Sequence, residues 1–377
     1  MALQKEVKLT KSKLNKKITT NDKHEVEELK TIEKIAGFEQ LDPEAMSFVE
    51  YTEKTFSNVC IVPLFDLHIG GEGTKLERLK LIIDFVKNTP NAVAILGGDV
   101  LDNATLNGAT NAHTSKLNPD HALDLAVKLL EPIKDKIALV TAGNHDGLSG
   151  GRNKDSNMAP AKQLAKRLGV KYAPFNAMMR IKLPLKNAKR NKKDTINYNV
   201  FITHGSGSAG SKAATVDTAL KKAMNACSRL NVLPDLILTG HFHADANGMF
   251  NLSVNRYDDF GRVIGVMQKD VRVESLSTMQ EANTYALANN MDITKANIPA
   301  INVCWLKNPY FNESSKTWEY EFLAQATKFP ILQNNKNNYS RIAIEYLKHY
   351  EEDKKLEEDL RELCKDKTFE EIIDEIK

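Results

Sequence analysis

Five short apolar runs in this chain each stop at side chains that can bind a metal ion. One run covers residues 137–140 and is followed by Gly143, Asn144 and His145. The other four are 61–65 before Asp66 and His68, 92–96 before Asp99, 200–202 before His204, and 236–238 before His241 and His243. Uninterrupted apolar runs are typical of strands buried on both faces. Because ligands of α/β sheets bind at the carboxyl ends of strands, the five polar ends predict one site at one sheet edge.

Amphipathic segments separate these runs. Apolar residues recur at helical spacing in four of them, 76–86, 123–130, 161–168 and 220–227. Apolar strands that alternate with amphipathic helices predict an α/β fold with a sheet covered by helices. Four further strands are expected at 179–183, 196–200, 262–266 and 318–322, with a hydrophilic loop at 186–193 between the first two.

The ends of the chain differ from its centre. Residues 1–50 begin with many lysines and contain Asp42-Pro43-Glu44, a typical helix start, so we expect a basic, partly helical extension. Residues 336–377 are charged, with Leu356, Leu360 and Leu363 at helical spacing, and predict a helical tail. The segment between them, 51–335, is expected to form the main domain.

Composition excludes several classes of protein. The net charge of +3 is too small to indicate nucleic acid or membrane binding by itself. The four cysteines lie far apart and form no C-x-x-C pair, so they predict neither a disulfide framework nor a structural zinc site. No apolar run approaches the roughly 20 residues that span a bilayer, and the N-terminal sequence lacks the apolar core of a signal peptide. We expect a cytoplasmic protein with no membrane partner.

The polar ends of the runs form a consistent set of metal ligands. Asp66 and His68 are two residues apart, and we expect their side chains on one side of an extended chain. Together the runs offer seven oxygen and nitrogen donors and no thiolate: Asp66, His68, Asp99, Asn144, His204, His241 and His243. Such donors suit Mn²⁺, Fe or Zn²⁺. Seven are too many for one tetrahedral ion, and they predict two ions about 3.5–4 Å apart that share a carboxylate.

These residues resemble the five sequence motifs of the calcineurin-like metallophosphoesterases, in the order of that family. The motifs are Asp66-Leu67-His68, Gly98-Asp99-Val100-Leu101-Asp102-Asn103, Gly143-Asn144-His145-Asp146, Thr203-His204 and Gly240-His241-Phe242-His243. The third and fifth motifs look similar to those of the DNA-repair exonuclease-like branch, and the chain also resembles phosphoesterases encoded by phages. The resemblance implies a four-layer α/β/β/α sandwich with a dinuclear metal centre.

The resemblance also implies a role for each motif residue. Asp66, His68 and His243 would hold one metal ion, Asn144, His204 and His241 the other, and Asp99 would bridge them. His145 would contact the substrate phosphate or protonate the leaving oxygen. Asn103 and Asp146 would orient their neighbours, and the carboxylate of Asp146 would steady His145. Mn²⁺ is the expected ion, with Fe, Zn²⁺ or Ni²⁺ as alternatives.

The chemistry expected of such a site is phosphoester hydrolysis. Two cations lower the pKa of a bridging water, and the resulting hydroxide attacks phosphorus in line. Arg152 is a candidate phosphate ligand because a guanidinium fits phosphate oxygens, and His113 is a second candidate. Ser206 and Ser208 are expected to shape the loop after His204 rather than to act as nucleophiles, because water is the expected nucleophile.

The substrate stays open between several classes. Phosphoprotein phosphatases of this family have Arg where this chain has Asn103, which favours a phosphodiesterase, and among these a DNA or RNA nuclease. A phosphatase or a cyclic-nucleotide or other small-molecule phosphodiesterase is the first alternative, and a non-catalytic scaffold that binds nucleic acid or a partner is the second. The lysines and arginine of the loop 186–193 could contact phosphates, or the loop could be an ordinary solvated hairpin tip. Aromatic residues that could stack on bases are not clustered beside it, which weakens the case for nucleic acid. The oligomeric state is open, a dimer included.

Overall fold

The computed structural model describes residues 47–103, 115–146, 159–184, 195–207, 211–227, 232–257, 262–281, 298–312 and 317–331. All of them belong to one unit, Met46–Lys377. The expected N-terminal and C-terminal helices lie outside these ranges, as does the loop 186–193. In the described part, no helix has both the length and the apolar character needed to cross a membrane.

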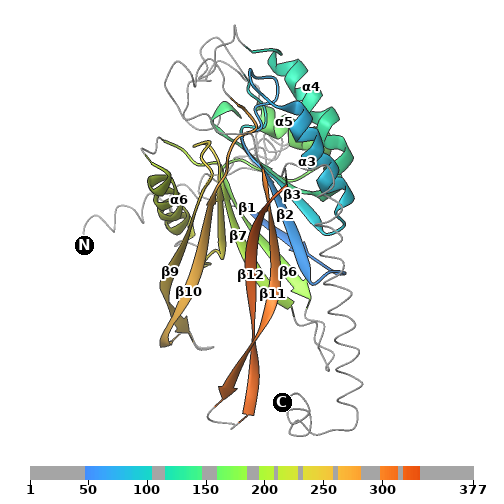
Figure 1. Cartoon of the computed structure of the whole chain (residues 1–377). Helices are drawn as coiled ribbons and strands as arrows, with labels where there is room; N and C mark the ends of the chain where they lie inside the picture. Colours follow the sequence, from blue (N-terminus) through green and yellow to red (C-terminus); the bar gives the residue numbers. More distant parts are fainter. Residues whose placement is uncertain are drawn as a thin grey trace, which may run out of the picture. The chain divides into compact units, whose positions relative to one another are not determined.

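Two six-stranded sheets form the centre of this unit (Figure 1). The first sheet has the order β12 (Thr317–Pro330), β11 (Pro299–Asn312), β2 (Asn58–Leu64), β3 (Ala92–Gly97), β4 (Ile137–Thr141) and β5 (Tyr172–Ala173). The second has the order β1 (Ser47–Thr52), β6 (Asn176–Pro184), β7 (Thr195–Thr203), β8 (Leu236–Thr239), β10 (Val263–Ser275) and β9 (Ala246–Tyr257). Strand β1 crosses the expected domain boundary at residue 50.

In the described part of the chain, four α-helices cover the outer faces of the sheets. On the first sheet lie α3 (Leu76–Asn88), α4 (Pro119–Leu130) and α5 (Pro160–Leu168), and on the second lies α6 (Lys212–Cys227). All four helices coincide with the amphipathic segments of the sequence. The resulting layers are helix, sheet, sheet and helix, which confirms the expected α/β/β/α sandwich.

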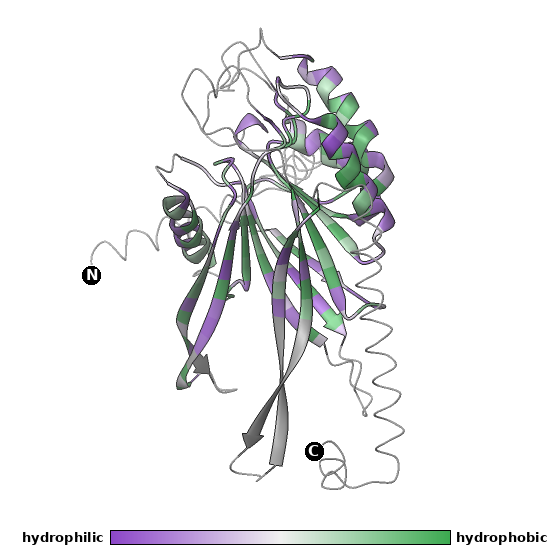
Figure 2. Cartoon of the chain, viewed as in Figure 1, coloured by the Kyte–Doolittle hydropathy of each residue, from purple (hydrophilic) through white to green (hydrophobic). Residues whose placement is uncertain are grey.

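The alternation of side chains explains why the central strands are apolar throughout. On β8, Leu236 and Leu238 pack between the two sheets, whereas Ile237 packs under α6. On β3, Val93 and Ile95 face the other sheet, while neighbouring alanines face the helices. Each strand is therefore buried on both sides, and Figure 2 shows hydrophobic colour along these central strands.

An ionic cluster joins the two sheets near one edge. The fully buried carboxylate of Glu274, on β10, accepts hydrogen bonds from Arg272 at 2.6 Å and from Lys328 of β12 at 2.9 Å. Lys328 also pairs with Asp245 at 2.5 Å, two residues beyond His243. This cluster connects β12 to the loop that follows β8.

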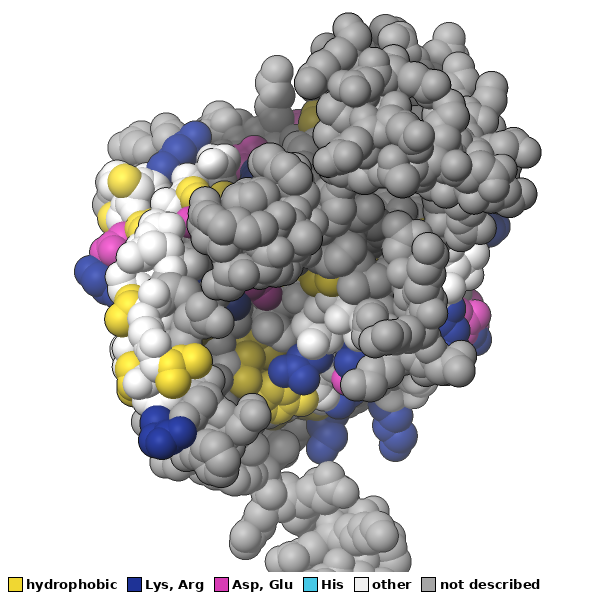
Figure 3. Space-filling view, turned by 90° about the horizontal axis from the view of Figure 1, so that it is seen from below, with side chains coloured by type: hydrophobic (Ala, Val, Ile, Leu, Met, Phe, Trp, Pro, Cys, Tyr) yellow, Lys and Arg dark blue, Asp and Glu magenta, His cyan; other side chains and the backbone are white. Residues whose placement is uncertain are grey.

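The far end of the β9–β10 hairpin is less covered. Val263, Ile264 and Val266 expose more than half of their surface there. Seen from below, the molecule shows hydrophobic side chains between separate Lys and Arg residues rather than a continuous basic band over the described part of this face (Figure 3).

Candidate metal centre

The predicted ligands lie where five strands end. Asp66 and His68 follow β2, Asp99 follows β3, and Asn144 opens the short 3₁₀ helix η2 (Asn144–Asp146) after β4. His204 follows β7, and both His241 and His243 follow β8. β2, β3 and β4 are parallel neighbours in the first sheet, and β7 and β8 are parallel neighbours in the second. The two sets of strand ends meet at one edge, where Asp66 Oδ1 lies 3.4 Å from His243 Nε2. The structure brings all seven predicted ligands together.

The backbone at this edge is left-handed rather than extended. Six non-glycine residues of the described part have positive φ, and all belong to the motifs: Asp66, His68, Asp99, Asn103, His241 and His243, with φ between 44° and 71°. Such angles are uncommon for residues with a side chain and typically occur at functional sites. Asp66 and His68 point into one site, as expected. They do so because both residues have left-handed backbone angles, and not because side chains alternate along an extended strand.

Two glycines make room for the carboxylates. A Cβ on Gly143 would lie 2.1 Å from Asp99 Oδ1, and a Cβ on Gly240 would lie 2.3 Å from Asp66 Oδ2. Any side chain at either position would displace a carboxylate. The glycines of the third and fifth motifs are thus explained by close approach.

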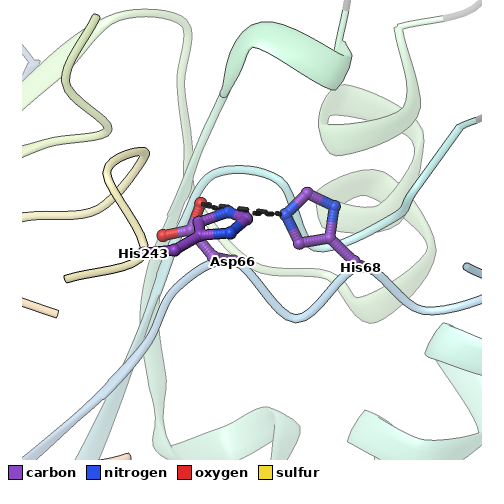
Figure 4. A group of neighbouring side chains, drawn as sticks. All are labelled: Asp66, His68 and His243. Atoms are coloured by element: carbon purple, nitrogen blue, oxygen red, sulfur yellow. Dashed lines mark hydrogen bonds and ion pairs between the residues drawn. The ribbon is translucent and has the colours of Figure 1, made fainter. Parts of the chain in front are cut away.

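One candidate ion site consists of Asp66, His68 and His243 (Figure 4). His68 Nε2 lies 3.1 Å from His243 Nε2, and Asp66 Oδ1 lies 3.4 Å from His243 Nε2 and 3.9 Å from His68 Nε2. Asp66 and His68 are buried, whereas one third of the His243 side chain is exposed. We call this group the His68 side.

A second candidate site, the His241 side, consists of Asn144, His204 and His241. Asn144 Oδ1 lies 2.9 Å from His204 Nε2 and 2.6 Å from His241 Nδ1. Asp99 Oδ2 lies 3.0 Å from His204 Nε2, and Asp99, His204 and His241 form a potential ion-binding group. Asp99 also groups with His68 and His145, so it lies next to both sides.

The spacing of these atoms fits bound cations. Ligands about 2.1 Å from an ion are about 3.0 Å apart at right angles and about 3.4 Å apart in a tetrahedron. The distances above scatter around those values, and the donors are carboxylate, amide and imidazole atoms that converge without thiolates. The residues fit a divalent metal centre.

Hydrogen bonds orient three of the imidazoles. His68 Nδ1 lies 3.3 Å from the carboxylate of Asp102, which leaves Nε2 facing His243. His204 Nδ1 donates to the carbonyl of Gly97 at 3.1 Å, and His241 Nε2 donates to the carbonyl of Gly207 at 2.8 Å. Because the other ring nitrogen then presents its lone pair to the ion site, these partners select the metal-binding tautomer.

The charges of the site favour a cation. Burial raises the pKa of the Asp99 carboxyl, but the neighbouring His204 and His145 outweigh this and hold that pKa below its usual range. Burial lowers the pKa of His204, yet Asp99 and Asp66 raise it to about 10. In the metal-free site, the buried carboxylates of Asp99 and Asp66 hold a proton on His204. The same negative charge would attract a metal ion in place of that proton.

The residues around His145 differ from the ligands. His145 Nδ1 lies 2.6 Å from the carbonyl of Asp102, and its backbone N–H donates to Asp99. Asn103 Nδ2 donates to the carbonyl of His145 at 2.6 Å. Burial lowers the pKa of His145, but Asp99 and the Asp102 hydrogen bond produce a net rise. The ring is therefore fixed beside the ion sites with Nε2 3.9 Å from Asp99 Oδ2.

Asp146 supports the backbone of the site. Its Oδ2 accepts hydrogen bonds from the N–H groups of Gly143 at 2.7 Å and Asp99 at 3.3 Å. Burial and the charge of Asp99 raise the pKa of Asp146 to about 7. Asp146 thus links the second and third motifs through two backbone N–H groups. The hydrogen-bond partner of His145 Nδ1 is the carbonyl of Asp102, where the sequence predicted support from Asp146.

Two expected substrate ligands, Arg152 and His113, lie outside the described residues. Conversely, Asp102 and the carbonyl of Gly207 contact the ligands and had no assigned role. Asp102 is part of the second motif, three residues after Asp99, and that position was the available signal. A backbone carbonyl leaves no such signal in a sequence.

Comparison with protein families agrees with this geometry. Residues 66–245 match the family model described as calcineurin-like phosphoesterase. This segment of the chain is similar to the calcineurin-like phosphoesterases. The match begins at Asp66 and ends two residues after His243, so it spans every predicted ligand. A comparison with curated proteins gives no match. The protein is a metal-dependent phosphoesterase, a hydrolase with a divalent metal centre.

Proposed function

We propose that the centre holds two ions, one on each side, with Asp99 between them. The His68 side supplies a carboxylate and two imidazoles, and the His241 side supplies an amide oxygen and two imidazoles. Support comes from Asp99, which groups with ligands of both sides. Mn²⁺ is the proposed ion because these oxygen and nitrogen donors suit it, with Fe, Zn²⁺ or Ni²⁺ as the alternatives.

When bound, two such cations would lower the pKa of a water molecule and would neutralise phosphate charge. The protein then has to position the phosphoester and protonate the leaving oxygen. His145 has the geometry for this: its Nδ1–H is engaged by the carbonyl of Asp102, and Nε2 remains on the ion side. As the oxygen of water bonds to phosphorus, the P–O bond to the leaving group breaks and its electron pair goes to the leaving oxygen, which takes the Nε2 proton of the doubly protonated His145 ring.

The proposed substrate is a phosphodiester. The observation that carries this is the side chain of Asn103, which donates to the carbonyl of His145 at 2.6 Å and lies 2% exposed. It therefore brings no positive charge toward the substrate. A monoester carries about one more negative charge than a diester, so this position suits the diester better.

Among phosphodiesters, nucleic acid is the leading candidate. The motifs resemble the DNA-repair exonuclease-like branch and phage-encoded phosphoesterases, and the sequence contains a basic loop at 186–193 and a lysine-rich N-terminal segment. Lysine and arginine side chains bind the phosphates of nucleic acids through their charge. A small-molecule phosphodiesterase or a phosphatase remains the alternative, and the experiment below separates them.

The test is hydrolysis in the presence of Mn²⁺ with three proteins: wild type, Asp99→Asn, and Asp124→Asn as a matched control. Asp124 is an exposed carboxylate on α4 that pairs with Arg167, so its loss leaves the metal centre intact. The substrates are a chromogenic phosphodiester, its monoester, cyclic nucleotides, and single- and double-stranded DNA and RNA. Metal content is measured on the same samples.

We expect wild type and the Asp124 variant to cleave the diester and nucleic acid, and the Asp99 variant to lose this activity. Cleavage of the monoester alone would overturn the phosphodiester proposal in favour of a phosphatase. Cleavage of cyclic nucleotides without DNA or RNA would overturn the nuclease. A protein that binds nucleic acid, holds no metal ion and cleaves none of the substrates would be a scaffold.

A further inference from the structure

The loop after β7 connects the metal centre to helix α6. It begins at His204 and continues through Gly205, Ser206 and Gly207, with φ of 94° at Gly205 and 88° at Gly207. A Cβ on Gly205 would lie 2.9 Å from Thr239 Oγ1, whereas Gly207 has no atom within 4 Å of that position. A side chain at Gly207 would therefore meet no neighbour, and the contacts that hold this part of the loop are made by Ser206 and by the backbone.

Lys222 fixes this loop from the third turn of α6. Its ammonium group donates to the carbonyl of Ser206 at 2.6 Å and to the hydroxyl of Ser206 at 2.5 Å. Two hydrogen bonds from one charged donor hold both the backbone and the side chain of Ser206. Hydrogen bonds of this kind, with an ionised donor, are stronger than neutral ones.

The next residue in the loop orients a metal ligand. The carbonyl of Gly207 accepts a hydrogen bond from His241 Nε2 at 2.8 Å, and His241 Nδ1 then faces Asn144 Oδ1 at 2.6 Å. His241 differs in this from His204 and His68, which present Nε2 to the site. If the Gly207 carbonyl moved, His241 would lose the contact that selects its tautomer.

We propose that Lys222 is a positioning residue for the His241 side of the metal centre. It acts through Ser206 and Gly207, which place the carbonyl that orients His241. This inference rests on the proposed two-ion centre and assigns a function to a helix residue outside all five motifs. Lys222 is not a ligand and does not take part in the chemical step.

The two ways in which Lys222 could influence the ions have opposite signs. As a positive charge it repels a cation, so removing the charge would strengthen metal binding. As the anchor of the loop it keeps His241 in its binding orientation, so removing the anchor would weaken binding. The direction of the change in affinity therefore distinguishes positioning from charge.

Titration of metal-free protein with Mn²⁺, followed by calorimetry, measures the two affinities without any substrate. The variants are Lys222→Met, Lys222→Arg and the matched control Lys221→Met. Lys221 is the adjacent lysine of the same helix, is largely exposed, and pairs with Asp217 at 2.6 Å. Thermal unfolding of the metal-free proteins reports any loss of stability separately.

We expect Lys222→Met to weaken one of the two Mn²⁺ affinities by about tenfold, the lower end of the effect of removing an outer-shell partner. Lys222→Arg should restore it, because a guanidinium can donate to both oxygens of Ser206. Lys221→Met should leave both affinities unchanged. Ser206→Ala, which removes one of the two acceptors and leaves the helix intact, should weaken the same affinity by about threefold.

Several results would overturn the proposal. Unchanged or tighter Mn²⁺ binding in Lys222→Met would do so, and so would equal weakening in Lys221→Met. If the wild type binds two ions and Lys222→Met binds them with the same affinities, the role of Lys222 is refuted and the two-ion centre stands. A wild-type protein that binds fewer than two ions would refute the two-ion centre itself.

Discussion

The two sides of the metal centre are supported by different chemistry. On the His68 side, His68 is backed by the Asp102 carboxylate, and the ligand Asp66 is fully buried. On the His241 side, both imidazoles are backed by neutral backbone carbonyls, and Asn144 contributes a neutral amide. A carboxylate behind an imidazole raises its basicity more than a carbonyl does. The comparison predicts a tighter ion on the His68 side and a more exchangeable one on the His241 side.

The strongest test removes what both sides share. In Gly143→Ala, the new Cβ would lie 2.1 Å from Asp99 Oδ1 and force this carboxylate, the proposed bridge, out of place. Gly143 has no left-handed φ, so the clash is the main effect. We expect a loss of activity of about a thousandfold, beyond the 10–100-fold typical of an outer-shell partner. Diester hydrolysis and metal content measure it.

Gly169→Ala is the control for that change. Gly169, at the end of α5, has a φ of 71° but nothing within 4 Å of the added carbon. We expect it to destabilise the fold by about 1–2 kcal/mol, the cost of a left-handed residue with a side chain, and to leave metal binding unchanged. Equal metal loss in both variants would mean that the effect of Gly143→Ala is general destabilisation rather than displacement of Asp99.

The next variant separates the two sides. Asp102→Asn removes the charge behind His68 and keeps a side chain of the same size. We expect one Mn²⁺ affinity to fall by about 10–100-fold while the other stays near its wild-type value. Calorimetric titration of the metal-free protein measures both. If both affinities fell together, the His68 and His241 sides would not be independent and the comparison would fail.

The layers of this fold could be predicted from sequence because burial leaves a pattern. Val93 and Ile95 face one layer and their neighbours the other, so β3 is apolar throughout. The ligands were predicted for a similar reason, since each follows such a strand. Their left-handed backbone was not predicted, because side-chain type only weakly restricts φ once tertiary contacts decide it.

Other features left weaker traces in the sequence. Strand β1 lies at an edge of the second sheet and alternates between exposed and half-buried residues, so it resembles a polar extension. The link from Lys222 through Ser206 to the Gly207 carbonyl depends on a contact between residues 16 positions apart. Such a contact is formed by the packing of α6 and has no local pattern.

Metal removal sharpens the comparison with a smaller effect. When a chelator is added stepwise, we expect the ion of the His241 side to leave first, because its ligands include the neutral amide of Asn144 where the His68 side has the carboxylate of Asp66. An affinity difference of about tenfold would let a one-ion species accumulate. Native mass spectrometry detects this species directly. Simultaneous loss of both ions, with no one-ion species, would show that Asp99 couples the two sides more strongly than their supports differ.

The smallest expected effect comes from the far end of the His68 support. The buried side chain of Gln280 donates to the Asp102 carboxylate at 3.5 Å and to the carbonyl of Glu72 at 3.3 Å. These are long hydrogen bonds, so Gln280→Ala should weaken the ion of the His68 side by only about threefold to fivefold, as expected for one modest hydrogen bond. Gln163→Ala, on the exposed face of α5, is the matched control. Because Asp102 still pairs with His68 in this variant, a loss as large as that of Asp102→Asn would place the decisive support in Gln280 and not in the carboxylate.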